Sequence, residues 1–312
     1  MIVKRNFSPV RILPYVWKEL LFTGALATVV CFFHIRHGVT LLALPFGPLG
    51  VLGTALAIFL GFRNNSGHAR WWEGRTIWGN IVHSSRTLAR LVISATDNAQ
   101  KLGKGGGADK IAAYKREMVL RQIAFAHALR KHLRREDTWA ELAPLLPPAD
   151  QPRVLAAANK PNMILQIQAD RLKDGVREEM LGQFDPISLE PNLAALNAAQ
   201  GGCERIKNTP MLRQYEFFTR VFLWTFLAIL PPSLLGVLPA ESRWLALPGA
   251  LAIGFTYVIT NKIGQVTEDP FENRIHDVPM TALCTTLERD LREQLGDTQL
   301  PPPAEPVDGY LF

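Results

Sequence analysis

Charged residues leave four long gaps along the chain. Segments 20–35, 37–62, 221–240 and 244–261 contain no Asp, Glu, Lys or Arg and are 16, 26, 20 and 18 residues long. A helix rises about 1.5 Å per residue, so about 20 apolar residues cross a hydrocarbon core of about 30 Å. The buried helices of a large soluble protein are the alternative, but such runs are usually shorter and interrupted by charge. The pattern therefore predicts four membrane-spanning helices, paired at the two ends of the chain.

The sequence between and after these gaps is charged and has a helical period. From residue 63 to 90 no proline interrupts the chain, so one long helix is expected to continue directly from the second span. Its apolar stripe contains Trp71, Trp78, Ile81, Val82, Ser85 and Leu88. Further helices are predicted at 161–181, at 191–207 and at 109–135, the last of these with Ile111, Met118, Phe125 and Leu129 on or near one face. A final helix is predicted after Asp277, which we expect to be its N-cap, with Gly296 as its stop; its apolar face is Met280, Leu283, Leu287 and Leu291. Because no segment alternates like a strand, the predicted fold class is an all-α membrane protein.

These elements predict five segments. They are 1–62, an N-terminus with the first two spans; 63–216, a large helical domain; 217–262, the last two spans; 263–296, a C-terminal helix; and 297–312, a proline-rich, extended tail.

Basic residues predict the orientation. Four of them, Lys4, Arg5, Arg11 and Lys18, precede the first span, as in a signal peptide, but no small-x-small cleavage site follows before the next apolar run. We therefore expect the span to be retained. The turn between the first two spans contains one basic residue, Arg36, and the turn between the last two contains Arg243, whose charge Glu241 balances. Because basic residues favour the cytoplasmic side, both termini and the middle segment are expected there.

Composition narrows the chemistry. The net charge of +6 is expected beside anionic lipid, and no nucleic-acid motif accompanies it. The three cysteines are too few and too scattered for a disulfide framework. His127 and His132 are five residues apart and do not share a helix face, and an interfacial role for His34 and His37 is commoner than metal binding. With no hydrolase, zinc-protease or dinucleotide motif, we expect no enzyme, cofactor or metal; a membrane-anchored scaffold or binding protein remains an alternative.

Three groups of residues, in order along the chain, resemble the bestrophin family, especially its bacterial branch. They are 58–65 (IFLGFRNN) with 70–75 (RWWEGR); 203–206 (CERI) with 208–210 (NTP); and 268–271 (EDPF) with Asn273 and 277–279 (DVP). The resemblance covers about residues 1–295. It implies a homopentameric ion channel of a bacterial inner membrane, in which the second helix of each subunit lines the pore.

The resemblance also implies which residues form the pore. An apolar neck would consist of Thr54, Ile58 and Phe62, which share one helix face because they are four residues apart. Five copies of an apolar side chain around an axis form a constriction that can gate by dewetting. The alternative is that Ile58 and Phe62 face lipid or a neighbouring helix. A second, cytoplasmic constriction would lie at Met211, which follows Pro210.

The remaining expectations concern ions and structure. Bacterial relatives favour monovalent cations such as sodium and eukaryotic ones chloride, so we expect monovalent ions, with cations preferred by relatedness alone. The segment after Pro270 and Phe271 contains Arg274 and Ile275 and lacks the acidic run of a calcium site, so no calcium activation is expected. Arg70 and Glu73 are three residues apart and can pair beneath Trp71, most simply in a structural role.

Overall fold

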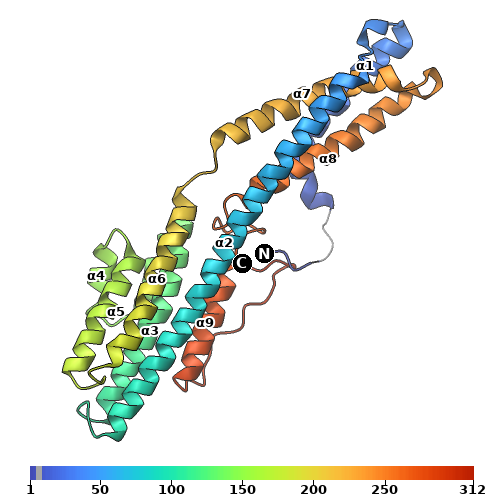
Figure 1. Cartoon of the computed structure of the whole chain (residues 1–312). Helices are drawn as coiled ribbons and strands as arrows, with labels where there is room; N and C mark the ends of the chain where they lie inside the picture. The colour runs from blue at the N-terminus through green and yellow to red at the C-terminus, as the bar shows by residue number, and fades with distance from the viewer. Residues whose placement is uncertain (5–8) are drawn as a thin grey trace. The chain divides into compact units, whose positions relative to one another are not determined.

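The computed structural model describes residues 1–4 and 9–312, and this part of the chain is almost entirely helical. Figure 1 labels its α-helices, which are α1 (Pro9–His37), α2 (Phe46–Lys101), α3 (Ala108–Arg134), α4 (Gln151–Ala156), α5 (Lys160–Arg177), α6 (Asp185–Asn208), α7 (Arg213–Val237), α8 (Ala246–Thr267) and α9 (Met280–Gln294). Short 3₁₀ turns lie at Thr40–Leu42, Trp139–Leu145 and Ala240–Leu245. Within the described residues, β pairing is limited to isolated bridges near the two chain ends. The predicted all-helical fold class is therefore confirmed.

The chain folds into two compact units. One, which we term the membrane region, comprises Lys4–Arg70 and Pro210–Glu268; the other, the polar region, comprises Met1–Val3, Trp71–Thr209 and Asp269–Phe312. The division falls inside α2, which runs without interruption for 56 residues. The helix predicted to continue from the second span is thus present. It ends where Gly103 adopts a positive φ of 67° and Lys104 N donates to Ala99 O at 3.0 Å, the bond that closes a Schellman cap.

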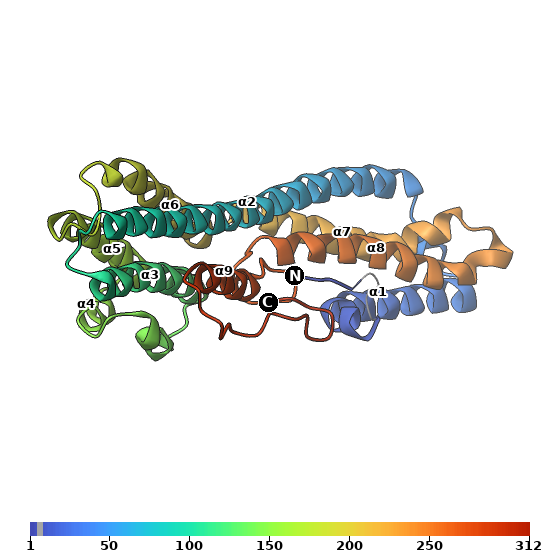
Figure 2. The same cartoon turned by 90° about the horizontal axis from the view of Figure 1, so that it is seen from below.

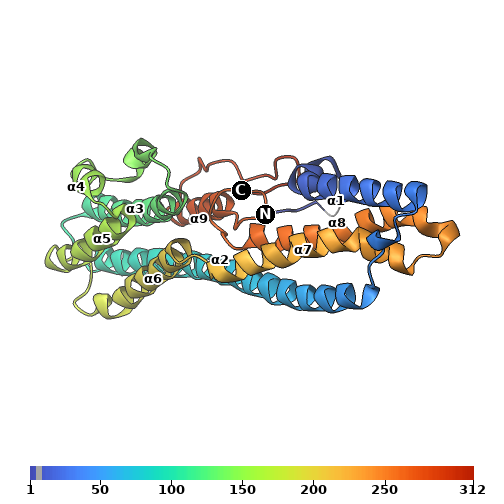
Figure 3. The ribbon, with the colours of Figure 1, turned by 90° about the horizontal axis from the view of Figure 1, so that it is seen from above.

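The membrane region contains four helices that are long and apolar enough to cross a bilayer. They lie within Ile12–His37, Thr40–Lys101, Arg213–Val237 and Ala240–Thr267, and they coincide with the four predicted spans. Within this region α1, α7 and α8 run side by side in Figures 2 and 3. Their packing surfaces are narrow strips of residues such as Ala27, Leu227 and Ala250, while apolar side chains on the other faces are exposed. Such an arrangement is typical of helices whose outer faces contact lipid tails.

The polar region has a continuous apolar core built around α3. Ile111, Met118, Phe125 and Leu129, the face predicted from the sequence, are all buried there. The core also buries the stripe of α2 at Trp78, Ile81 and Leu88 and the face of α9 at Met280, Leu287 and Leu291. Helix periodicity therefore identified the buried faces of three helices correctly.

Two local predictions are corrected by the structure. Asp277 does not cap α9: the N-cap position is Pro279, and Asp277 Oδ2 instead accepts from Arg274 N at 3.0 Å in the preceding loop. The helix expected from residue 191 begins at Asp185, because Pro186 lies in the first turn, where its missing amide hydrogen costs nothing. Gly296, with φ of 82°, follows the end of α9 as predicted.

The proline-rich tail is non-helical, as predicted, but it is packed against the rest of the polar region. Leu311 N donates to Met1 O at 2.8 Å, and Val3 N donates to Gly309 O at 3.0 Å. The backbone amide of Ala282 in α9 donates to Phe312 O at 2.7 Å. The two ends of the chain therefore lie side by side next to α9 (Figure 2).

Candidate functional site

One face of the first half of α2 is unpacked in the single chain. Ile58 and Phe62 expose 54% and 67% of their surfaces, and Thr54 on the same face is also exposed. The Thr54 hydroxyl donates to Gly50 O at 2.9 Å within the helix, so its proton is hydrogen-bonded without water. The predicted neck residues thus form one exposed and largely apolar stripe.

The opposite face of the same helix is a packing seam. Buried residues recur there at intervals of three and four: Leu49, Gly53, Leu56, Leu60, Arg63 and Gly67. The seam contacts α7 and α8. A Cβ on Gly53 would lie 3.1 Å from the ring of Phe226, and the Tyr257 hydroxyl donates to Gly53 O at 3.2 Å. This close approach fixes which face of α2 is left exposed.

An exposed apolar stripe on a membrane helix can contact lipid, a second subunit or the wall of a pore. Both a lipid-facing and a pore-lining stripe are exposed in one protomer, so exposure is required for the pore assignment but does not select it.

Met211 lies in the short link between α6 and α7, outside any helix, and is half-buried. Two other apolar residues are far more exposed and were missed from the sequence. Phe184 and Ile187, at the start of α6, expose 76% and 72% of their surfaces. The available signal was their position, beside Asp185 and Pro186 at a helix start, where a polar surface is the rule.

Two of the family motifs, the one at 70–75 and the one that begins at residue 268, contact each other within the polar region. Trp71 Nε1 donates to His276 O at 2.9 Å, and Phe271 is buried, with its ring 3.0 Å from where a Cβ on Gly74 would lie. Val278 N donates to Pro270 O at 3.0 Å. These contacts join α2 to the segment before α9, which supports a structural role for this motif.

The ion pair of Glu73 was not anticipated. Its carboxylate accepts from Arg205 Nη2 of α6, a residue 132 positions away. A spacing of three on one helix suggests Arg70 as a further partner, and that pairing stays a prediction; local spacing contains no information about a partner on a distant helix.

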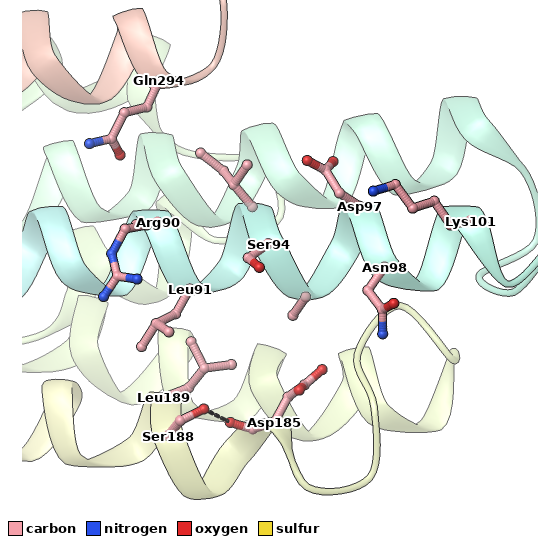
Figure 4. A pocket seen from close by; sticks show the side chains of 12 residues that line it. Arg90, Leu91, Ser94, Asp97, Asn98, Lys101, Asp185, Ser188, Leu189 and Gln294 are labelled. Carbon is pink, nitrogen blue, oxygen red and sulfur yellow. Dashed lines mark hydrogen bonds between the residues drawn. The ribbon is translucent and has the colours of Figure 1, made fainter.

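A hollow of the polar region with a largely polar lining lies between α2, α6 and α9 and has a volume of about 810 Å³ (Figure 4). Its charged groups have mixed sign and several are already engaged: Asp97 pairs with Lys115, and Asp185 Oδ2 accepts from Gly182 N at 2.6 Å. Arg90 and Lys101 also line it. No arrangement of nucleophile and base is present among these residues.

Acidic side chains after Phe271 are used within the protein. Glu272 accepts from Lys207 Nζ at 2.5 Å. Asp277 is buried, and burial raises the pKa of its carboxyl. Among the described residues, no three His, Cys, Asp or Glu side chains are placed to hold a metal ion.

Comparison with known proteins identifies the family. Residues 6–293 match the family model described as bacterial/fungal bestrophin protein. The chain belongs to the bestrophin family. The resemblance noted in the sequence is therefore confirmed over most of the chain.

Named relatives of this bestrophin include bacterial proteins described as channels. It is 33% identical over 263 residues to the voltage-dependent anion channel-forming protein YneE of Escherichia coli O157:H7, covering 84% of this chain and 81% of that protein. It is 27% identical to the voltage-dependent anion channel-forming protein mll4386 of Mesorhizobium japonicum, covering 97% and 90%. Its fold matches a crystal structure of a bacterial bestrophin homolog from Klebsiella pneumoniae, solved by zinc phasing, with a TM-score of 0.79, 26% identity, and coverage of 91% and 100%.

Proposed function

We propose that this bestrophin is the subunit of an ion channel in a bacterial inner membrane, with five copies surrounding one pore. Family membership and the channel names of its relatives support an ion channel. The structural observation that carries the pore assignment is the exposed stripe of Thr54, Ile58 and Phe62 opposite a fully packed seam. A fivefold axis beside this stripe would surround the ion path with side chains that are mostly exposed in the protomer.

In this arrangement the neck acts as an apolar gate. Rings of Ile58 and Phe62 exclude water when they are close together, which imposes a dehydration barrier on any ion. Thr54 places a hydroxyl and a methyl at one end of the neck. Because its proton is bonded to Gly50 O, the hydroxyl offers only acceptor capacity to passing water.

Both chain ends belong to the same compact unit as residues 71–209, since Met1 and Val3 pair with the tail. An even number of spans is consistent with this pairing. The basic residues before the first span favour the cytoplasm for this whole unit.

Ion selectivity is the finer question. The cation preference expected from bacterial relatedness stands against the names of the relatives, which describe anion channels. The neck side chains are uncharged and favour neither sign. We therefore propose a channel for monovalent ions, and the reversal potential decides between cations and anions.

For the second constriction, exposure favours Phe184 and Ile187 over the half-buried Met211, because a residue that narrows a pore must project from the protomer. Alanine at each of the three positions separates these alternatives through the single-channel conductance.

The test is a planar-bilayer recording of the purified protein under a NaCl gradient. We expect a conducting particle of about 174 kDa, five times the 34.8 kDa of one chain. Phe62→Ala is expected to raise the ratio of open to closed channels about tenfold, which corresponds to ~1.4 kcal/mol of free energy between the two states. Leu21→Ala, which changes an exposed apolar residue of α1, is the matched control and should behave as wild type.

The reversal potential then assigns the permeant ion: a value near the sodium equilibrium potential supports cations, and one near that of chloride supports anions. A protein that is not pentameric and does not conduct would favour the membrane-anchored scaffold.

A further inference from the structure

A charged side chain is buried in the seam immediately after the neck. Arg63 follows Phe62 in α2 and exposes only 4% of its surface. Its guanidinium contacts two residues of or beside α8: Nη1 donates to Asn261 Oδ1 at 2.9 Å, and Nε donates to Glu268 Oε1 at 2.7 Å. Nη2 lies 2.6 Å from the same carboxylate oxygen. Removing either partner of such a buried pair leaves a charge without compensation, which is strongly unfavourable.

The backbones of α2 and α8 approach closely at the same level. Asn64 Nδ2 donates to Thr260 O at 3.1 Å. A Cβ on Gly264 would lie 2.2 Å from Asn64 Oδ1, and one on Gly67 would lie 2.7 Å from Thr267 Oγ1. A side chain at Gly264 or Gly67 would therefore have to displace Asn64 or Thr267, and a rotation of α2 at this level would break the polar contacts of Arg63 and Asn64.

The same stretch of α8 also holds α1. Lys262 Nζ lies 3.0 Å from Glu19 Oε1 of α1. Thr260, Asn261 and Lys262 are consecutive, so one turn of α8 is bonded to both α1 and α2 and provides a fixed reference for α2.

The remainder of the seam lacks such directionality. Leu56 and Leu60 are buried by apolar contacts, and in lipid these resist a small rotation of a helix weakly because lipid tails offer similar contacts. Hydrogen bonds from a planar guanidinium to two acceptors tolerate rotation poorly. Successive residues of a helix project about 100° apart. With Arg63 held in the seam, Phe62 must therefore point out of it, and Ile58 and Thr54 on the same face follow.

We propose that Arg63 is a positioning residue: bonded to Asn261 and Glu268, it sets the rotation of α2 and so directs Phe62 at the pore axis. This inference rests on the proposed channel function. Because Glu268 neutralises the guanidinium inside the protein, Arg63 orients the gate without attracting ions. Its removal therefore changes gating and leaves ion selectivity unchanged.

The first experiment compares Arg63→Gln with Arg220→Gln in planar bilayers. Arg220 is a matched control, because it lies on a helix of the same region but is exposed and pairs with Glu216 on its own helix. Arg63→Gln is expected to raise the open probability several-fold with an unchanged reversal potential, while Arg220→Gln behaves as wild type. A shifted reversal potential, or gating identical to that of the control, overturns the proposal.

Two further variants separate orientation from charge and from folding. Arg63→Lys keeps the charge but has one nitrogen for two acceptors, so intermediate gating is expected; wild-type gating would show that charge alone suffices and would overturn the proposal. Asn261→Ala removes one acceptor and leaves the ion pair with Glu268 intact. If Arg63→Gln fails to assemble, a several-fold change in Asn261→Ala supports the proposal and its absence overturns it.

A structural readout is independent of conduction. In Phe62→Cys, oxidation should cross-link neighbouring subunits at the neck, and the three native cysteines are buried, which keeps the background low. Adding Arg63→Gln should lower the yield several-fold, whereas adding Arg220→Gln should not. An unchanged yield overturns the positioning role alone. If the wild-type protein does not conduct and the Phe62→Cys variant does not cross-link, the proposed function is overturned, and this inference with it.

Discussion

The membrane region and the polar region are both built from helices, but they bury apolar side chains differently. In the polar region, large apolar residues such as Phe125 and Leu129 are fully enclosed. In the membrane region, Leu21, Leu41 and Val51 are exposed, and burial is confined to narrow strips. The same residue types are thus found in two environments: water drives apolar side chains together, whereas lipid tails contact them as readily as protein does.

Both regions nevertheless bury an arginine. Arg121 in α3 is fully buried, with Nη2 2.6 Å from Asp150 Oδ2 and Nη1 3.2 Å from Gln168 Oε1. Arg63 in α2 is bonded in a comparable way to Asn261 and Glu268. Directional polar contacts therefore fix helix positions in each region, and the regions differ mainly in what the apolar residues contribute.

The largest expected effect comes from the buried arginine of the polar region. Arg121→Ala leaves Asp150 and Gln168 without their partner, so we expect this region to lose about 3–5 kcal/mol of unfolding free energy. Hydrogen exchange of α3 in detergent measures it. Arg153→Ala removes an exposed ion pair in which Nη2 lies 3.6 Å from Asp170 Oδ2, and it should cost about 0–1 kcal/mol of unfolding free energy. Equal losses in the two variants would contradict the role given to burial.

The apolar comparison is tested by a pair of leucines. Leu129→Ala creates a cavity in the polar core and should cost about 2–5 kcal/mol. Leu21→Ala, on the exposed face of α1, should leave the unfolding temperature of the detergent-solubilised protein nearly unchanged. A large loss from Leu21→Ala would show that this face is buried against protein, for example in a subunit interface.

The smallest expected effect is a pH dependence of the polar region alone. A hydrogen bond from His127 lowers the pKa of Glu288, and one from Arg116 lowers the pKa of Asp297. Their stabilisation is present above the ordinary carboxyl range of about pH 4 and is lost as the pH falls through the lower folded values. Asp277, whose pKa burial raises, acts in the opposite sense because its protonation favours the fold.

Thermal unfolding at about pH 6 and about pH 3 measures this dependence. Glu288→Gln should lose less stability on acidification than wild type, while Glu305→Gln in the exposed tail should not differ from it. If Glu288→Gln follows the wild-type profile, its pair with His127 does not stabilise the fold.

The sequence alone identified the four candidate spans, the continuity of α2 and the buried faces of α2, α3 and α9. These features depend on local composition and helical period, which a single segment contains in full. It also located the bestrophin motifs and, through them, the stripe of Thr54, Ile58 and Phe62. Whether that stripe lines a pore remains a proposal.

Only the tertiary structure decided which polar groups meet. Arg63 reaches Asn261 and Glu268 about 200 residues along the chain, Glu73 pairs with Arg205, and the tail pairs with the first residues. Asp277, at a suitable spacing for a helix cap, bonds to its own loop instead. A polar side chain takes whichever partner the packed helices place within about 3 Å, and that placement is set by packing over the whole chain rather than by neighbouring residues.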